Sequence, residues 1–372
     1  MHGGRAIVSK RSIIAALAVL FASNTYVTYA ADKTPPDAAT LAAIADVKAC
    51  VNVGEPRKMV GLCGRAIRTG KLPDKYLIMA YSHRAYAYVT REQYRHALRD
   101  YGAVLRIDSR DADAYAGRAQ VNNRMDNWRA AVEDYATAIQ IRPDFTAAYY
   151  NRGLVYAQHK QYEKAVADFS KTLALAPKEV DALYNRAYAH YLLGRFDRAV
   201  RDFSGVLKRQ PENINALKLR GESQFLSGKW QSAAADIRKT IERDGGDYVR
   251  FLLLYVSEKR TAGAAQKAEE NLRRRNESVD LQTWYGLVTA FYLGQIREKA
   301  LRNAIPERLS AAEQSESIPL IDYYIAEQRL NEGRLEEAER LFQKAENSAA
   351  KGTFEKIAAG QALKRLEARK QR

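Results

Sequence analysis

The sequence lacks the residue patterns on which most enzyme active sites depend. It has no glycine-rich phosphate-binding loop, no G-x-S-x-G nucleophile turn and no H-E-x-x-H zinc motif. Its histidines share no common spacing, as His83, His96, His159 and His190 show. We therefore expect no catalytic residues, no bound metal and no cofactor.

Long apolar runs are also scarce. The main one spans residues 13–22, about half of the ~20 residues that a membrane-spanning helix needs. Arg5, Lys10 and Arg11 precede this run, and Thr28 and Ala30 supply small residues after it. The pattern predicts a secretory signal peptide over residues 1–30, cleaved after Ala30, and hence a periplasmic protein. A retained membrane anchor is the alternative.

Acidic residues are outnumbered by basic ones. The chain has 60 Lys and Arg against 44 Asp and Glu, a net charge of +16, and stays strongly basic without the predicted signal. This excess gives solubility or attracts an anionic partner, such as an acidic protein or an anionic envelope surface. Nucleic acid is disfavoured because the basic residues are dispersed, with one short run at residues 273–275.

What the sequence does contain is a period of 34 residues, marked by Ala97, Ala131, Ala165, Ala199 and Ala233. A period of this size indicates one supersecondary unit copied in tandem. With position 1 at Ile78, large residues fall at positions 4 and 24, small ones at 8 and 20, and mostly proline at 32. Large and small residues spaced by four share one helical face, and proline ends a helix. The pattern predicts an all-α chain of helical hairpins.

These columns resemble the tetratricopeptide repeat family in five copies from Ile78 to Gly245. The resemblance implies a right-handed superhelical solenoid that binds other proteins. We divide the chain into a signal peptide (1–30), a degenerate hairpin (31–77), five repeats (78–245) and degenerate hairpins with a capping helix (246–372).

The two cysteines precede the clear repeats. If Thr40 is position 1 of a degenerate repeat, Cys50 and Cys63 fall on positions 11 and 24, which face each other in this family. Export to an oxidising compartment then predicts a disulfide. The alternative is a redox pair or a metal site, although the spacing fits neither C-x-x-C nor a common zinc pattern.

Two charged columns run through all five repeats. Position 7 is always arginine and position 23 always aspartate: Arg84, Arg118, Arg152, Arg186 and Arg220, with Asp100, Asp134, Asp168, Asp202 and Asp236. We expect each arginine to pair with an aspartate on an adjacent helix, within its repeat or across the repeat boundary. The alternative is that the arginines are presented to an anionic ligand.

First helices of this family line the inside of the superhelix. The resemblance thus predicts a peptide-binding groove formed by Tyr86, Tyr150, Asn151, Leu154, Tyr184, Asn185, Tyr188, Tyr191 and Phe225. Tyrosine combines apolar area with a polar tip, which suits such a groove. The alternative is that some rings pack against the next helix. The carboxylate-gripping residues of chaperone-binding members are absent, since Ser82 and Tyr86 occupy the first pair of positions.

After Gly245 the order of segments resembles the C-terminal half of NlpI-type bacterial envelope lipoproteins. The resemblance rests on residues 252–259, on Trp284 with residues 291–294, and on residues 322–326 with Gly333 and residues 341–345. It implies a non-catalytic, dimerising adaptor that brings cell-wall hydrolases to a periplasmic protease or to wall-synthesis enzymes. No cysteine directly follows the predicted cleavage site, so the lipid anchor of that group is not expected here.

We therefore expect an exported scaffold that binds a protein or peptide, with a homodimer left open. The alternatives are a structural subunit of an envelope assembly or secretion complex, and a periplasmic chaperone.

Overall fold

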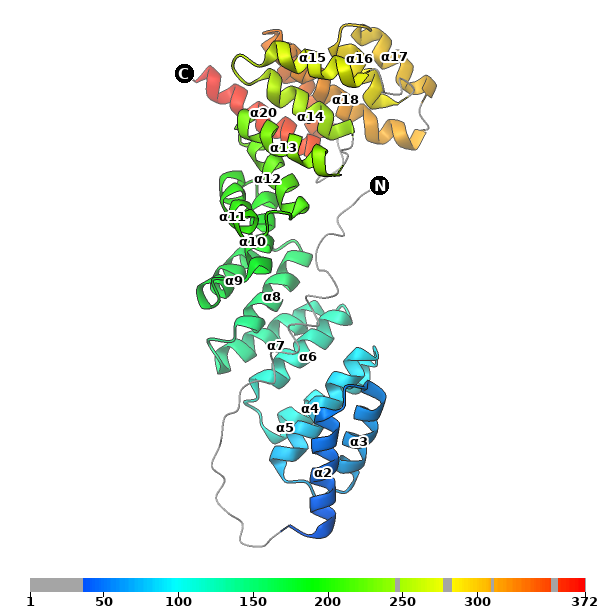
Figure 1. Cartoon of the computed structure of the whole chain (residues 1–372), viewed down its shortest axis with the longest axis vertical. Coiled ribbons are helices and arrows are strands. Elements are labelled where there is room, and N and C mark those ends of the chain that lie inside the picture. Colours follow the sequence, from blue (N-terminus) through cyan, green and yellow to red (C-terminus); the bar gives the residue numbers. More distant parts are fainter. Residues whose placement is uncertain (1–35, 245–247, 277–282, 309–310, 349–353, 372) are drawn as a thin grey trace. The chain divides into compact units, whose positions relative to one another are not determined.

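The computed structural model describes residues 36–244, 248–276, 283–308, 311–348 and 354–371. The predicted signal peptide lies outside these residues. All regular structure in the described part is helical, in nineteen helices named α2 to α20 (Figure 1). The helices pack as sequential hairpins, which confirms the predicted all-α repeat architecture.

The chain divides into two compact units: unit 1 ends at Ala189 and unit 2 begins at His190. The described part of unit 1 holds α2 (Ala38–Asn52), α3 (Pro56–Arg68), α4 (Asp74–Thr90), α5 (Tyr94–Ile107), α6 (Ala112–Arg124), α7 (Trp128–Ile141), α8 (Thr146–Gln158), α9 (Tyr162–Leu175) and most of α10 (Val180–Leu192).

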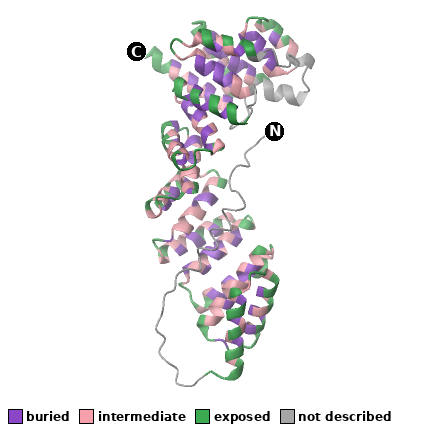
Figure 2. Cartoon of the chain, in the orientation of Figure 1, coloured by how far each residue is buried: buried purple, intermediate pink, exposed green. Residues whose placement is uncertain are grey.

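Unit 2 begins in the last turn of α10. It continues with α11 (Phe196–Arg209), α12 (Ile214–Leu226), α13 (Trp230–Asp244), α14 (Tyr248–Lys259), α15 (Ala265–Asn276), α16 (Trp284–Tyr292), α17 (Glu298–Arg308), α18 (Ala311–Asn331), α19 (Leu335–Ser348) and α20 (Phe354–Lys370). In each unit the buried residues follow the faces on which neighbouring helices meet (Figure 2).

Each repeat is a hairpin of a first helix, here the A helix, and a second, the B helix. All five alanines at position 20 have no exposed surface, and in the four hairpins that lie within one unit the two helices pack closely together. The bulky residues at position 24 fill the adjoining space and are buried: Tyr101, Tyr135, Phe169, Phe203 and Ile237. Gly153 shows how close the approach is, because a Cβ built there would lie 2.8 Å from Cε1 of Phe169.

The turn between the A and B helices has one backbone conformation in all five repeats. Position 15 lies in the left-handed region at Glu92, Asp126, Lys160, Gly194 and Gly228. Glycine adopts this region without steric cost, whereas other residues enter it rarely. Three repeats thus tolerate a non-glycine residue because packing of the hairpin fixes the turn.

The N-terminal hairpin is held covalently. Cys50 at the end of α2 and Cys63 in α3 form a disulfide, and neither residue has exposed surface. Ala43, Val47 and Met59 pack around the two cysteines and complete the core of this hairpin.

Candidate protein-binding site

The A helices of unit 1 lie next to one another: α4 contacts α6, and α6 contacts α8. Five side chains on these helices are half-buried and polar. We call them the A-helix row: Tyr86 on α4, Gln120 and Asn123 on α6, and Tyr150 and Asn151 on α8. The A helices of three successive repeats therefore each carry partly exposed polar side chains.

Three members of the row have polar groups open to a ligand. Tyr86, Gln120 and Asn151 make no side-chain hydrogen bond with any described residue. A carboxamide both donates and accepts, so it satisfies the N–H and C=O groups of a peptide backbone. The tyrosine adds an apolar ring and one hydroxyl.

The other two members tie successive repeats together. Asn123 donates from Nδ2 to Oε1 of Gln158 over 3.4 Å, and Asn185 on α10 donates from Nδ2 to the hydroxyl of Tyr150 over 3.1 Å. Burial raises the pKa of Tyr150 far above its ordinary value, so this phenol stays neutral. At these positions the structure favours the alternative in which groove residues pack against the next helix.

Of the remaining predicted groove residues, Tyr184 and Tyr188 on α10 are half-buried, as is Asn185. Leu154, Tyr191 and Phe225 are buried, so they do not line an open groove in this structure. Leu154 packs in a core cluster with Ala165 and Phe169.

Tyr191 and Phe225 are buried within unit 2. The hydroxyl of Tyr191 donates to Oε2 of Glu222 over 3.0 Å, and the ring lies 5.9 Å from that of Phe196. Phe225 is fully covered by Trp230 and by Phe354 of α20, whose ring centroid is 5.6 Å away. The C-terminal helix thus occupies the side of α12 that was predicted to be open.

The arginine and aspartate columns form ion pairs inside repeats. In four repeats Nε and Nη2 of the arginine donate to both carboxylate oxygens of the aspartate sixteen residues later, over 2.6–2.9 Å. The pairs are Arg84–Asp100, Arg118–Asp134, Arg152–Asp168 and Arg220–Asp236. Arg186 lies on α10 in unit 1 and Asp202 on α11 in unit 2.

Two arginines of this column also reach the preceding repeat. Nη1 of Arg186 donates to Oγ of Ser170, and Nη1 of Arg220 donates to Oγ of Ser204, each over 3.2 Å. The hydrogen bond and charge of Asp168 raise the pKa of Arg152. These guanidiniums are engaged inside the fold, so the column stabilises the hairpins and their stacking, and its presentation to an anionic ligand is disfavoured.

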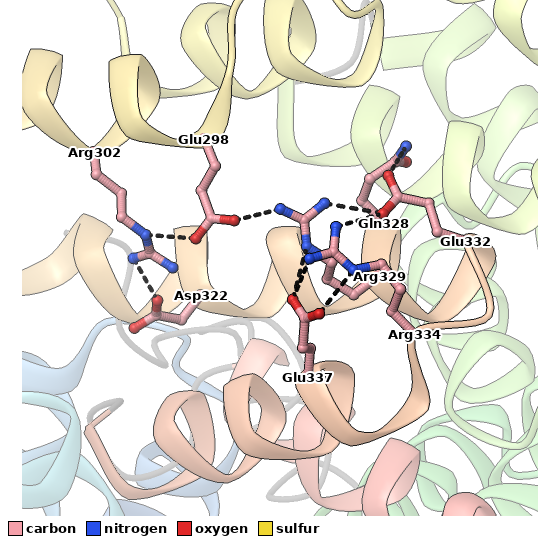
Figure 3. Close-up of polar contacts among 8 residues, drawn as sticks. All are labelled: Glu298, Arg302, Asp322, Gln328, Arg329, Glu332, Arg334 and Glu337. Atoms are coloured by element: carbon pink, nitrogen blue, oxygen red, sulfur yellow. Dashed lines mark hydrogen bonds and ion pairs between the residues drawn. The ribbon is translucent and has the colours of Figure 1, made fainter.

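Unit 2 contains a second charged network, across α17, α18 and α19 (Figure 3). Arg302 donates to Glu298 and Asp322 over 2.8 Å each, and Arg329 binds Glu298 and Glu332. Burial raises the pKa of Glu298, but Arg302 and Arg329 outweigh it and hold that pKa below its ordinary value. The carboxylates are compensated by arginines, which join three helices.

No group of three or more His, Cys, Asp or Glu side chains in the described part is placed to hold a metal ion. No helix there is long and apolar enough to cross a bilayer.

Comparison with known families identifies the repeat. Family models described as tetratricopeptide repeat or TPR repeat match residues 124–160, 146–179 and 184–248. Residues 124–179 and 184–248 thus match tetratricopeptide repeats. Tetratricopeptide repeat proteins are typically non-catalytic scaffolds that bind protein or peptide partners.

Several solved structures are similar to the chain, two of them described as tetratricopeptide repeat or TPR proteins. One from Parabacteroides merdae has 19% identity and a TM-score of 0.46, and covers 72% of this chain and 98% of its own. YrrB, described as having an unusual peptide-binding site, has 18% identity and a TM-score of 0.42, with coverages of 55% and 96%. PilF of Pseudomonas aeruginosa has 18% identity, a TM-score of 0.42 and coverages of 55% and 95%.

No curated protein matches the chain. The family models support the tetratricopeptide repeat, and they give no specific support to the NlpI-type layout.

Proposed function

We propose that this tetratricopeptide repeat protein is a non-catalytic adaptor of the bacterial envelope that binds an extended segment of a partner protein along its A-helix row. The observation that carries the proposal is the set of open polar groups on Tyr86, Gln120 and Asn151, which three successive A helices present. An extended segment has unpaired backbone N–H and C=O groups along its length. Carboxamides spaced along a row of helices supply partners for both.

The envelope location rests on two features of the chain. Residues 1–30 have the basic start, short apolar run and small residues of an exported protein. The Cys50–Cys63 disulfide fits the same compartment, since disulfides persist where the surroundings are oxidising. Within the envelope, the resemblance to NlpI-type proteins favours a role in bringing cell-wall hydrolases to a protease or to wall-synthesis enzymes.

The test is site-specific photocrosslinking in the native envelope. A photoreactive residue replaces Gln120 on the A-helix row or, as the control, Arg99, which is exposed on α5. We expect a discrete crosslinked partner from position 120 and none of that mass from position 99. Combined Tyr86→Ala and Asn151→Ala substitutions should abolish the crosslink while far-ultraviolet circular dichroism stays unchanged. Identical crosslinks from both positions would contradict the proposal.

A structural subunit is the second candidate. The ties Asn123–Gln158 and Tyr150–Asn185 join successive A helices, which is what a spacer needs. Such a subunit would co-purify with its assembly in fixed stoichiometry, and the Tyr86→Ala and Asn151→Ala substitutions would leave that stoichiometry unchanged.

A further inference from the structure

Unit 2 contains a cleft that is distinct from the A-helix row. It has a volume of about 510 Å³ and lies between the start of α11, the end of α12 and α20. The charged side chains that line it are Arg195, Asp197, Arg198, Arg201 and Arg365, and the polar ones are Gln361 and Ser227. Four arginines therefore face one cleft with a single aspartate.

Asp197, the aspartate of the cleft, does not neutralise the positive charge of the cleft. The carboxylate of Asp197 is bound by Nζ of Lys229 over 2.6 Å. Arg198 and Arg201 are exposed, and neither has an ion-pair partner among the described residues. They lie three residues apart on α11, where like charges repel. Elsewhere in unit 2, Arg220, Arg302 and Arg334 each bind a carboxylate.

Arg365 of α20 is fixed at the same cleft. Its Nη1 donates to the carbonyl of Leu226 over 3.0 Å, and its guanidinium lies 5.2 Å from the ring centroid of Trp230. Burial lowers the pKa of this guanidinium more than the charge of Glu327 raises it, and no carboxylate among the described residues lies within ion-pair distance of it. An incoming anion would gain from a positioned, poorly hydrated cation.

The backbone at the start of α11 adds to the positive electrostatic potential of the cleft. No side chain caps that end of the helix, and a helix N-terminus carries a partial positive charge.

We infer that this cleft binds an acidic peptide segment of a partner protein, with Arg198 and Arg201 pairing with its carboxylates and Arg365 holding a further one. The spacing favours a peptide over other anions. Residues three apart on a helix have side chains about 5–6 Å apart, and alternate side chains of an extended peptide repeat at about 6.6 Å. Gln361 offers a carboxamide to the peptide backbone. The cleft is a second interaction site, additional to the A-helix row.

The experiment titrates the full chain against a fluorescein-labelled peptide in which glutamate and glycine alternate, and follows the anisotropy. The test variant carries Arg198→Ala and Arg201→Ala. The control carries Lys239→Ala and Arg273→Ala, which removes the same charge from exposed positions of unit 2 outside the cleft. We expect binding about tenfold weaker, or more, in the test variant and changed less than about twofold in the control.

Three results would overturn the inference. Equal weakening in both variants would show non-specific attraction to a basic protein. Equal binding of an alternating lysine–glycine peptide by the wild-type chain would show that the negative charge of the peptide does not determine binding. In the third result, the chain binds phosphatidylglycerol vesicles but not the peptide, and only the test variant loses this vesicle binding. That result would assign the cleft to a membrane surface. Photocrosslinking at position 120 reports on the A-helix row independently, so the two sites can fail separately.

Discussion

Arg152 on α8 and Asp168 on α9 are joined by two parallel hydrogen bonds of 2.8 Å each. The aspartate side chain is 7% exposed and the arginine side chain 17%. A carboxylate so deeply buried depends on this one guanidinium for its charge compensation, and the same geometry recurs in three other repeats.

We therefore expect removal of one partner to cost more than removal of both. Arg152→Met should lower the free energy of unfolding by about 3 kcal/mol, because it leaves a buried carboxylate unpaired. Adding Asp168→Asn should restore part of that loss. A double-mutant cycle by urea denaturation measures the coupling, and Arg152 with Asp134 serves as the additive control. Simple additivity for Arg152 with Asp168 would contradict the expectation.

A second prediction concerns the contact between repeats one and two. A Cβ added to Gly117 would lie 2.4 Å from Cζ of the buried Tyr101 ring. Gly117→Ala should therefore destabilise the chain by about 1–3 kcal/mol, because the ring must move within a packed core. Gly102→Ala is the control, since its Cβ meets only Nη1 of Arg106, at 3.8 Å, and should stabilise α5 by up to ~1 kcal/mol. Equal melting temperatures for the two variants would refute the steric argument.

The buried tyrosines predict sensitivity to alkali. Burial raises the pKa values of Tyr101 and Tyr135 far above their ordinary value. Above about pH 10 the unfolded chain loses these protons while the folded chain keeps them, so stability falls as pH rises. Below that pH their contribution is fully present.

Unfolding by urea at several values between pH 9 and pH 11 measures this slope. Tyr135→Phe should make the decline shallower. Phe169→Leu is the control, because it changes the equivalent buried ring without changing ionisable groups, and should lower stability without altering the slope. Parallel slopes for wild type and Tyr135→Phe would show that Tyr135 does not cause the effect.

The disulfide should stabilise the N-terminal hairpin measurably. Cys50 and Cys63 are separated by 13 residues, and closing a loop of that size contributes about 3 kcal/mol through the unfolded chain. Reductant should therefore lower the melting temperature of the wild type and leave the Cys50→Ser, Cys63→Ser double variant unchanged. Alkylation and mass spectrometry of the unreduced protein provide the decisive check, since two alkylated thiols would rule the disulfide out.

The hairpin architecture was predictable because its packing restricts residue types at fixed positions. Ala97 and the equivalent alanines must be small where two helices touch, and Tyr101 and its equivalents must fill the space beside them. The arginine column at position 7 and the aspartate column at position 23 were visible in the sequence for the same reason, since packing restricts the residue types at those positions too. Their pairing within the repeat required the structure, since only the packed hairpin shows that position 7 lies opposite position 23.

Two features gave weaker signals in the sequence. The left-handed turn at position 15 holds Glu92, Asp126 and Lys160 in three repeats, so it has the usual glycine marker only at Gly194 and Gly228. The burial of Phe225 was not predictable from the repeat, because the helix that covers this ring, α20, lies outside the repeats. Arg365 of α20 donates a hydrogen bond to the carbonyl of Leu226, which is 139 residues earlier in the chain. A pattern that repeats every 34 residues carries no information about such a contact.

This contact has a consequence for recognition by tetratricopeptide repeats in this chain. Phe354 of α20 packs against Phe225 on the A helix of the fifth repeat and covers it. It thus takes the place that the side chain of a bound partner would take. Under the proposed function, Phe225 of that repeat is therefore closed to a bound segment by the chain's own last helix.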